Sequence, residues 1–333
     1  MSVLVTGGAG YIGSHTVKVL RKAGAEVVIY DDLSAGHRRA AKAAGAPLEQ
    51  GAIGDTARLR EVMRAHGVDA VMHFAAWLSV ADSVRDPAGY YENNVGGAVS
   101  VLRAAAECGV RHFIFSSTAA TFGNPIRTPI DESHPQHPIS AYGESKLAIE
   151  RALPHFERAY GIRSVALRYF NAAGADPEGA LGEDHDPEFH VIPRALDATV
   201  GRGDFAIFGT DYETPDGTCL RDYVHVTDLA AAHLLSLESL RSGAQSTAYN
   251  LGNGKPVSVR EVVDSVERVT GRTLPAGTGP RRPGDPAVLF ASSEKIRREL
   301  GWAPQYEAID VIVETAWRWR ETHPRGYEDR EAR

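Results

Sequence analysis

The sequence predicts an α/β fold: a doubly wound parallel sheet accompanied by a smaller mixed α/β region. Short apolar runs rich in β-branched residues alternate with longer helical patterns through the first half of the 333-residue chain. A glycine-rich turn joins the first run to the first helical pattern, and after Asn171 the elements become shorter. Near-continuous apolar strands that alternate with helices are typical of a parallel sheet covered by helices on both faces.

The elements of the first half follow one another in a regular order. Strands are predicted at 3–7, 26–31, 70–76, 111–117 and 163–170. Helices are predicted at 12–23, 56–66, 84–107 and 141–160. Because connections between parallel strands of one sheet are almost always right-handed, we expect right-handed crossovers here.

The second half reads as loops and shorter elements. Residues 174–188 are rich in glycine, proline and acids, which predicts an ordered loop or lid. The later predicted elements are a helix at 191–201, a strand at 205–209, a strand-turn-helix unit at 221–240, a strand at 248–252 that could rejoin the first sheet, and a helix opened by a capping box at 258–261. The polar end, 323–333, is expected to fray. We therefore expect a larger domain over 1–170 and a smaller one over 171–333, with interleaved segments.

Composition excludes several classes of protein. A formal net charge of −7 argues against an electrostatic grip on nucleic acid or an anionic membrane. No apolar run reaches the roughly 18 residues that span a bilayer. Two distant cysteines, Cys108 and Cys219, exclude a disulfide framework, and the N-terminal segment lacks the charged and apolar parts of a signal peptide. We expect a cytoplasmic protein that binds neither membrane nor nucleic acid.

Four glycines, Gly7, Gly8, Gly10 and Gly13, lie between the first predicted strand and the first predicted helix. Such glycines permit a tight turn, close approach of the backbone to a pyrophosphate and close packing of helix on strand. The helix N-terminus adds unpaired N–H groups and a positive dipole end. In this strand-turn-helix context the motif predicts a Rossmann-like dinucleotide-binding domain.

Asp31 ends the second predicted strand, where a carboxylate binds both hydroxyls of the adenosine ribose. An acid there repels a 2′-phosphate, so the sequence favours NAD over NADP. Arg38 and Arg39 follow closely enough to keep NADP open as an alternative.

Tyr142 and Lys146 are four residues apart on a predicted helix and therefore share one of its faces. A free tyrosine titrates near pH ~10, so it is a poor base at neutral pH. A neighbouring ammonium and a positively charged nicotinamide would both favour the phenolate and lower its pKa. Thr118, just beyond a predicted strand, would hydrogen-bond the substrate oxygen. Taken alone, the pair is more often a surface pair, and it is the surrounding motifs that favour catalysis.

Seven motifs make nearly the whole chain resemble the extended short-chain dehydrogenase/reductase family, in particular its members that epimerise UDP-hexoses at carbon 4. They are TGGAGYIGSHT (6–16), YYENNVGG (90–97), AYGESK (141–146), LRYFNAAGA (167–175), AIFGTDYETPDGTCLRDYVHVTDLA (206–230), YNLGNG (249–254) and RRPGD (281–285). The resemblance implies interconversion of UDP-galactose and UDP-glucose, with hydride transfer to bound NAD+, rotation of the 4-keto sugar and hydride return. Tyr142 would shuttle the proton, Lys146 would hold the nicotinamide ribose, and the protein would be a homodimer in which helices 84–107 and 141–160 pair.

The resemblance also implies two sets of binding residues. The cofactor would contact Gly7, Gly10, Tyr11, Ile12, Gly13, Asp31, Asp32, Leu33, Ser34, Ala35, Gly36, Ala52, Ile53, Phe74, Ala75, Ala76, Asn93, Ser116, Tyr142, Lys146 and Phe170. The UDP-sugar would contact Thr118, Tyr142, Asn171, His190, Val191, Ala206, Phe208, Arg221, Arg282, Asp285 and Leu289. The two arginines would pair with the diphosphate, Ala206 and Phe208 would pack on uracil, and Asp285 would bind the uridine ribose.

The chain departs from the family pattern in three places. Ala52 stands where an acid usually contacts adenine, although Asp55 lies nearby. Trp77 and Leu78 replace a lysine that usually touches the cofactor, which would weaken cofactor retention. Leu289 lies where family members carry either tyrosine or a small residue, so glucose and galactose are expected and N-acetylated sugars stay open as an alternative.

Other readings are less favoured. A sugar-nucleotide dehydratase needs an acid and a base beside Thr118, where this chain has Ala119 and Ala120. A non-catalytic dinucleotide sensor has no need of Thr118, Tyr142 and Lys146 together. The histidines in HPQH (134–137) have no completing acid or cysteine, and 184–186 is read as a solvated loop, so no metal is expected.

Overall fold

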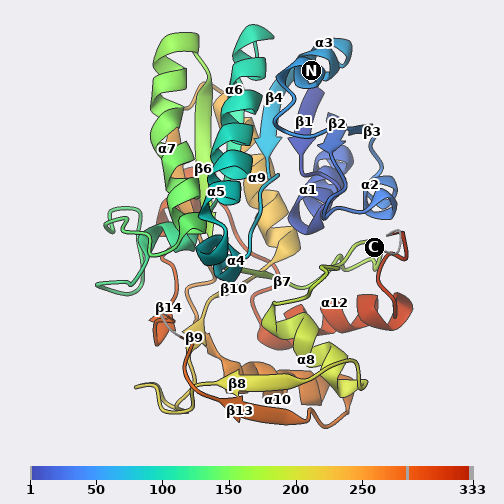
Figure 1. Cartoon of the computed structure of the whole chain (residues 1–333), viewed down its shortest axis with the longest axis vertical. Coiled ribbons are helices and arrows are strands. Elements are labelled where there is room, and N and C mark those ends of the chain that lie inside the picture. The colour runs from blue at the N-terminus through green and yellow to red at the C-terminus, as the bar shows by residue number, and fades with distance from the viewer. Residues whose placement is uncertain (1, 283–284, 330–333) are drawn as a thin grey trace.

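The computed structural model describes residues 2–282 and 285–329. Its upper part in Figure 1 is a seven-stranded sheet with helices packed on both faces. In sheet order the strands are β11 (Thr247–Leu251), β6 (Arg163–Tyr169), β5 (His112–Thr118), β4 (Val68–His73), β1 (Ser2–Thr6), β2 (Glu26–Asp31) and β3 (Leu48–Gln50). Every neighbouring pair is parallel, which confirms the predicted doubly wound, Rossmann-like sheet and the return of 248–252 to it.

Two apolar layers hold the sheet. On one face the core joins the strands to α1 (Tyr11–Lys22), α2 (Arg38–Ala44) and α9 (Val226–Arg241). On the other face it joins them to α3 (Thr56–Ala65), α6 (Gly97–Glu107) and α7 (Ala141–Tyr160). Alternate residues of a strand point to opposite faces, and accordingly Val3 and Val5 pack in the first layer while Leu4 packs in the second. Helix α2 and the short strand β3 were not among the predicted elements.

The prediction of one continuous helix over 84–107 is wrong. The chain forms α4 (Val80–Arg85), α5 (Pro87–Tyr90), the π-helix η1 (Tyr91–Gly96) and then α6. The first break occurs at Asp86, because the residue before a proline is disfavoured in the α conformation. In the π-helical segment the buried Asn94 accepts from the Trp77 backbone nitrogen (2.8 Å) and donates to its carbonyl (3.1 Å), which ties this segment to the end of β4.

The smaller part lies below the sheet in Figure 1. It contains three small sheets: β7 (Asn171–Ala173) with β10 (Tyr223–His225), β8 (Phe205–Phe208) with β13 (Ala276–Gly279), and β12 (Val257–Ser258), β9 (Leu220–Arg221) and β14 (Val288–Leu289). Its helices are α8 (Val191–Thr199), α10 (Val259–Thr270) and α12 (Ile309–Thr322), which share an apolar core of their own. The predicted capping box at Ser258 and Glu261 is present in both directions.

Two further predictions about irregular segments have different outcomes. Residues 174–188 form neither helix nor strand, as predicted. The end of the chain does not fray over its described part: Tyr327 is 4% exposed, and Asp329 Oδ1 lies 2.6 Å from His37 Nδ1. Residues 330–333 lie outside the described residues. Within the described ranges, no helix is both long and apolar enough to cross a bilayer.

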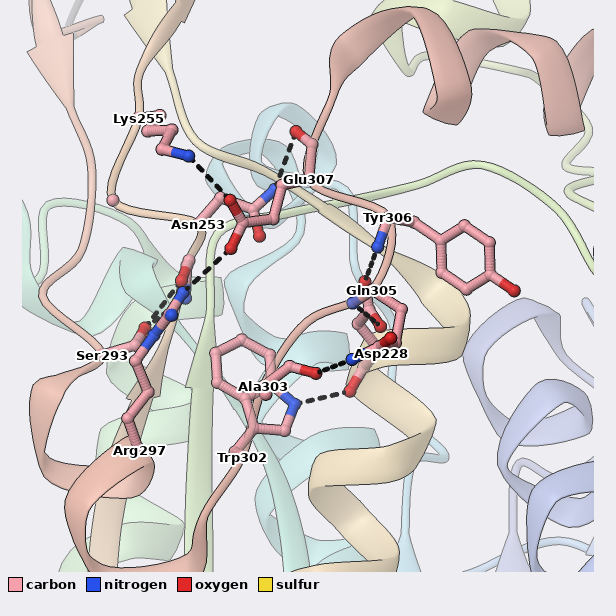
Figure 2. Close-up of polar contacts among 12 residues, drawn as sticks. Asp228, Asn253, Lys255, Ser293, Arg297, Trp302, Ala303, Gln305, Tyr306 and Glu307 are labelled. Carbon is pink, nitrogen blue, oxygen red and sulfur yellow. Dashed lines mark hydrogen bonds and ion pairs between the residues drawn. The ribbon is translucent and has the colours of Figure 1, made fainter.

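Asp228, in the first turn of α9, connects the two parts of the molecule (Figure 2). Its carboxylate accepts the backbone N–H groups of Gln305 (2.8 Å) and Tyr306 (3.0 Å), and its carbonyl accepts Trp302 Nε1 (2.9 Å). Trp302 follows α11 (Glu294–Leu300), and the segment continues into α12. Helix α9, which packs on the large sheet, thereby fixes the path of the chain from α11 into the smaller part.

Candidate active site

The predicted site residues of the first half meet at one edge of the sheet. The strand order reverses between β1 and β4, and ligands of such sheets bind outside the carboxyl ends of the strands at that point. The glycine turn follows β1, Phe74, Ala75 and Ala76 follow β4, Thr118 ends β5, and Phe170 follows β6. Parallel strands therefore deliver all these segments to the same edge.

The glycine turn has no room for side chains. Gly7 has a φ of +72°, and a Cβ there would lie 2.5 Å from the nitrogen of Ala75. A Cβ at Gly13 would lie 2.1 Å from the carbonyl oxygen of Gly7. Gly10 is the N-cap of α1, and no side chain caps that helix, so its first N–H groups are open to an anion. This cradle fits the diphosphate of a dinucleotide.

Asp31 organises the turn beside the glycines. Its carboxylate accepts the N–H groups of Ala9 (3.0 Å) and Leu33 (2.9 Å), and burial raises its pKa. Leu33 takes a left-handed φ of 64°, which the bond from its N–H holds in place. Asp32 Oδ1 accepts from Ser34, and Ala35 and Gly36 complete the turn, Gly36 lying close against Ala9 and Asp31.

The residues expected near the adenine, Ala52 and Ile53, and the nearby Asp55 make contacts within the protein. Ala52 accepts a hydrogen bond through its carbonyl from the Tyr30 hydroxyl (3.0 Å). Ile53 packs under Gly97, where a Cβ would lie 2.4 Å from the Ile53 Cδ1 atom. Asp55 caps α3 by accepting the Arg58 N–H (2.9 Å), so this nearby acid already serves the helix.

Thr118, Tyr142 and Lys146 come together at the end of β5. Helix α7 begins after its N-cap Ser140, and Gly143 lets its first turn approach the Ala120 carbonyl, to which a Cβ would lie 2.5 Å. Lys146 is 3% exposed and donates from Nζ to the Ser116 carbonyl over 2.9 Å. The strand end and the first two turns of α7 thus place a phenol, an amine and a hydroxyl on one wall.

Burial dominates the electrostatics of this wall. It raises the pKa of Tyr142 to about 12, against the lowering effect of a hydrogen bond with Thr118. It lowers the pKa of Lys146 to about 7, against the raising effect of Glu150. Glu150 is held by Arg168 (2.6 Å) and compensates the lysine only in part. The expected lowering of the Tyr142 pKa by Lys146 is therefore not present, because desolvation disfavours the charged form of both groups.

The remaining cofactor candidates lie around this wall. Ser116 is hydrogen-bonded to the Tyr169 hydroxyl, and Phe74 lies 4.6 Å from the His233 ring, centroid to centroid. Asn93 donates to Asn94 Oδ1 (3.0 Å) within the π-helix. The side chain of Trp77 is half-exposed and meets the Tyr90 ring edge-on at 5.5 Å. Trp77, which precedes α4, therefore packs on α5, and its backbone is held by Asn94.

A second group of predicted residues gathers in the smaller part. Arg221 forms an ion pair with Asp285 (2.8 Å), and the Arg282 guanidinium lies 4.4 Å from the centroid of the Phe208 ring. Ala206 is on the same strand, β8, as Phe208. Pro283 and Gly284 of the RRPGD motif lie outside the described residues.

Leu289 and Phe170 lie near the catalytic wall. Both pack against an apolar cluster of Ala119, Phe122 and Ile130, which includes η2 (Ala119–Phe122), the 3-10 turn after Thr118. Asn171 donates its N–H to the carbonyl of Asp222 (3.0 Å) at the start of the paired strands β7 and β10. The structure thus places the proposed sugar-side residues next to the end of β5.

Asp222 was not predicted as a site residue. It is fully buried, and its carboxylate accepts the N–H groups of Asn253 (2.7 Å), Gly254 (3.2 Å) and Ala291 (3.1 Å). It therefore ties the YNLGNG loop and the segment after Leu289 to β9 and β10. The signal in the sequence that could have identified Asp222 is its position as an acid in an otherwise apolar strand pattern.

His190 and Val191 begin α8, but His190 faces the preceding loop. Its Nδ1 atom lies 2.6 Å from Glu183 Oε1, and Glu183 is only 7% exposed. Within 184–186, which was expected to be a solvated loop, Asp186 is exposed, but the side chain of His185 is largely buried. Four potential metal-ligating groups converge here, a set that the sequence did not predict.

The chain belongs to the NAD dependent epimerase/dehydratase family, whose model matches residues 3–252. It is 51% identical over 328 residues to a UDP-glucose 4-epimerase of Halalkalibacterium halodurans, covering 98% of each chain. It is 50% identical to a UDP-glucose 4-epimerase of Lacticaseibacillus casei over 99% of this chain and 100% of that one. A crystal structure of UDP-glucose 4-epimerase from Brucella ovis in complex with NAD superposes with a TM-score of 0.93 at 50% identity, covering 95% of this chain and 97% of that one.

Proposed function

We propose that this chain is an NAD-dependent UDP-hexose 4-epimerase that interconverts UDP-galactose and UDP-glucose. The observation that carries the proposal is the set of Thr118, Tyr142 and Lys146, in which Thr118 and Lys146 are buried and Tyr142 partly so, beside the glycine turn and the uncapped N-terminus of α1 at the switch point of the sheet. Relatives of about half-identical sequence over nearly the full chain carry that activity in their names, which supports the same assignment.

The glycine turn and α1 would hold the NAD diphosphate, and Asp31 would favour NAD over NADP. When bound, NAD+ supplies an acceptor for the hydride at carbon 4 of the sugar and returns it to either face of the ketone. Tyr142 takes the proton from the 4-hydroxyl. It returns the proton to the 4-keto oxygen as the other epimer forms. Burial raises the pKa of Tyr142, and a positive charge bound beside it would favour the phenolate.

Thr118 and Lys146 position the reaction. The Thr118 hydroxyl lies beside the tyrosine and would hold the substrate oxygen in line for proton transfer. Lys146, with Nζ anchored on the Ser116 carbonyl, would use its remaining hydrogens to hold the nicotinamide ribose. Both side chains are buried, so neither needs to reorganise when the substrate binds.

The smaller part would hold the UDP moiety. Arg221 and Arg282 supply guanidinium groups that suit a diphosphate, and Phe208 and Ala206 supply a surface for uracil. Asp285, now paired with Arg221, would exchange that partner for the uridine ribose hydroxyls as the arginine turns to phosphate. Firm holding of UDP leaves the sugar free to turn about its link to the diphosphate.

The direct test is incubation of the purified chain with UDP-galactose, UDP-N-acetylgalactosamine and UDP-galacturonate in separate reactions without added NAD. The 4-epimer of each sugar is then measured by chromatography. We expect conversion of UDP-galactose to UDP-glucose. Formation of no epimer from any of the three would overturn the proposal.

A 4-epimerase of N-acetylated UDP-hexoses is the second candidate, because Leu289 is intermediate in size between the two residue types found at this position. A dehydratase is disfavoured because Ala119 and Ala120, beside Thr118, carry no group that moves a proton. Detection of a 4-keto-6-deoxy product from UDP-glucose would reverse that order.

We further propose a cytoplasmic homodimer with an NAD-binding domain over 1–170 and a UDP-sugar domain mainly over 171–333. Exposed apolar side chains on η1 and α6, including Tyr91 and Val99, support a partner surface along the helices expected to pair. The two cysteines are free, which suits a reducing compartment. Light scattering on the purified chain tests the dimer: the mass of one chain would contradict it.

A further inference from the structure

A short segment before α8 brings four metal-ligating groups together. Glu183, His185, Glu188 and His190 each direct one donor atom inward, and these atoms all lie within 4.8 Å of one another. His185 Nδ1 and His190 Nδ1 lie 3.1 Å and 2.6 Å from Glu183 Oε1, and 3.6 Å and 3.4 Å from oxygens of Glu188. Within the described ranges no other group of three or more such residues converges in this way.

These four atoms are buried and lack aligned hydrogen bonds. Glu183 Oε1, His185 Nδ1, Glu188 Oε2 and His190 Nδ1 are all shielded from solvent, and none has a hydrogen-bond partner within the part of the chain that the structure describes, despite the short distances between them. Buried polar atoms nearly always have a hydrogen-bond partner. Four buried polar atoms that converge without such partners indicate that a group accepting lone pairs binds between them. A cation at their centre is such a group.

The surroundings orient the donors toward this centre. Glu188 Oε1 accepts the N–H groups of Phe189 (2.9 Å) and His190 (3.0 Å), which leaves Glu188 Oε2 directed inward. The His185 ring stacks on Phe189 at 5.7 Å and meets the Tyr11 ring edge-on at 6.2 Å. In metal sites, the side chains that bind the ion are characteristically held in place by a second layer of contacts.

We propose that Glu183, His185, Glu188 and His190 bind one divalent transition-metal ion, with Zn2+ the best match. Two imidazole nitrogens and two carboxylate oxygens form a four-ligand set suited to tetrahedral zinc, whereas Mg2+ and Ca2+ prefer oxygen ligands alone. Two carboxylates also neutralise a divalent charge without any protonated histidine. The competing arrangement is two imidazolium groups paired with the same carboxylates, since contacts of 3.1 Å and 2.6 Å to Glu183 are also ion-pair distances, and the metal content of the chain separates the two.

The ion would act structurally. All four positions that a tetrahedral ion offers are filled by protein, which leaves none for a reacting group. The segment connects β7 to α8, with His190 as the N-cap of α8. On its other side Tyr11, in the first turn of α1, donates to the carbonyl of Gly174 (2.6 Å). The ion would therefore fix the loop between β7 and α8, which contacts the first turn of α1.

An entry route exists for the ion. His185 and Glu188 line an open cavity of about 630 Å³ whose other walls include Asp197, Arg202 and Arg320. An ion would approach the shielded donor atoms from this side.

The test uses the full chain without a polyhistidine tag, purified in metal-depleted buffer and analysed by mass spectrometry for bound elements. We expect about one divalent ion per chain, predominantly zinc. Removal by a chelator should lower the melting temperature, and added Zn2+, but not Mg2+, should restore it. Replacement by Co2+ should give the visible absorption bands of a tetrahedral site.

Variants test the ligands individually. Glu183→Gln and Glu188→Gln should each reduce the affinity for the metal at least tenfold, because loss of even a partner that only orients a ligand costs about 10–100-fold. Glu178→Gln, on the exposed part of the same loop, is the matched control and should retain the metal. If a ligand variant does not fold, the metal content and the cobalt spectrum of the unaltered chain still decide the matter. The proposal would be overturned if the purified protein contained no metal and its melting temperature changed neither with chelator nor with Zn2+, whatever its epimerase activity.

Discussion

The Nζ atom of Lys146 lies 2.9 Å from the carbonyl oxygen of Ser116, and the lysine side chain is 3% exposed. A carbonyl dipole stabilises an ammonium only in part, and the nearest acid, Glu150, is engaged by Arg168. The amine is therefore desolvated without a full counter-charge, which explains its lowered pKa. This arrangement makes the catalytic wall sensitive to any charge that binds beside it.

Replacement of Lys146 by methionine should change how stability depends on pH. In the folded, nucleotide-free chain the pKa of Lys146 is lowered from 10.5 to about 7, so between these values the unfolded state binds more protons than the folded state. The stability that Lys146 contributes is thus fully present above its unfolded pKa and is lost as pH falls through about 7. Relative to Lys146→Met, the unaltered chain should gain stability by about 1 kcal/mol per pH unit across this range.

Urea unfolding at several pH values between 7 and 9.5, on chain from which bound nucleotide has been removed, measures this difference. The exposed Lys42→Met variant is the control, and its stability should stay parallel to that of the unaltered chain. Parallel curves for Lys146→Met as well would show that Lys146 is not desolvated.

Asp31→Asn should weaken both the fold and the choice of cofactor. The Asp31 carboxylate accepts two backbone N–H groups, and an asparagine amide accepts fewer because one of its atoms is a donor. We expect a loss of about 1–3 kcal/mol in the free energy of unfolding and a larger share of NADP among bound nucleotides. Glu26→Gln, on the exposed residue at the other end of β2, is the control. Unchanged stability and unchanged nucleotide content would contradict the role given to Asp31.

Leu289 should control which sugars are accepted. It packs with Phe170 against the cluster that follows Thr118, so a smaller residue opens space beside the sugar. Leu289→Ala should raise the ratio of kcat/KM for UDP-N-acetylgalactosamine over UDP-galactose by about 10-fold, and Leu289→Tyr should lower it. Val288→Ala, whose side chain points to the other side of β14, is the control. If the ratio of kcat/KM for the two sugars were the same in all variants, Leu289 would not line the sugar pocket.

Purified protein should carry NAD through gel filtration. The glycine cradle and the Asp31 turn are intact, and Trp77 in place of a family lysine packs on Tyr90. Chromatography of nucleotide released by acid measures the content, and we expect well over half of the chains to be loaded. Recovery of nucleotide-free chain that binds added NAD only weakly would show that the replaced lysine is needed.

The strands and the glycine turn were predictable because their signals are local. Continuous β-branched runs and glycines at fixed spacing appear directly in the sequence. The break at Asp86 was also encoded, since Pro87 disfavours helix before it, but the π-helical turn depends on Asn94 reaching Trp77 across the site. Contacts between distant segments leave no periodic signal.

The electrostatics of the catalytic wall and the convergence of Glu183, His185, Glu188 and His190 could not be predicted for the same reason. The spacing of Tyr142 and Lys146 shows that they share a helix face, but not that burial would oppose the charge on both. His185 and His190 stand in an acidic, proline-containing loop, a composition typical of solvated segments. Their burial results from packing against Tyr11 and Phe189, which only the folded chain brings to them.

The central claim is that Tyr142 moves the proton at carbon 4. The most direct measurement is the rate of conversion of UDP-galactose to UDP-glucose by Tyr142→Phe, without added NAD, beside the control Tyr160→Phe at the exposed end of α7. We predict a loss of about 10²–10⁴-fold in kcat for Tyr142→Phe, with binding of the UDP-sugar retained and full activity in the control. Turnover by Tyr142→Phe within a few-fold of the unaltered chain would contradict the account.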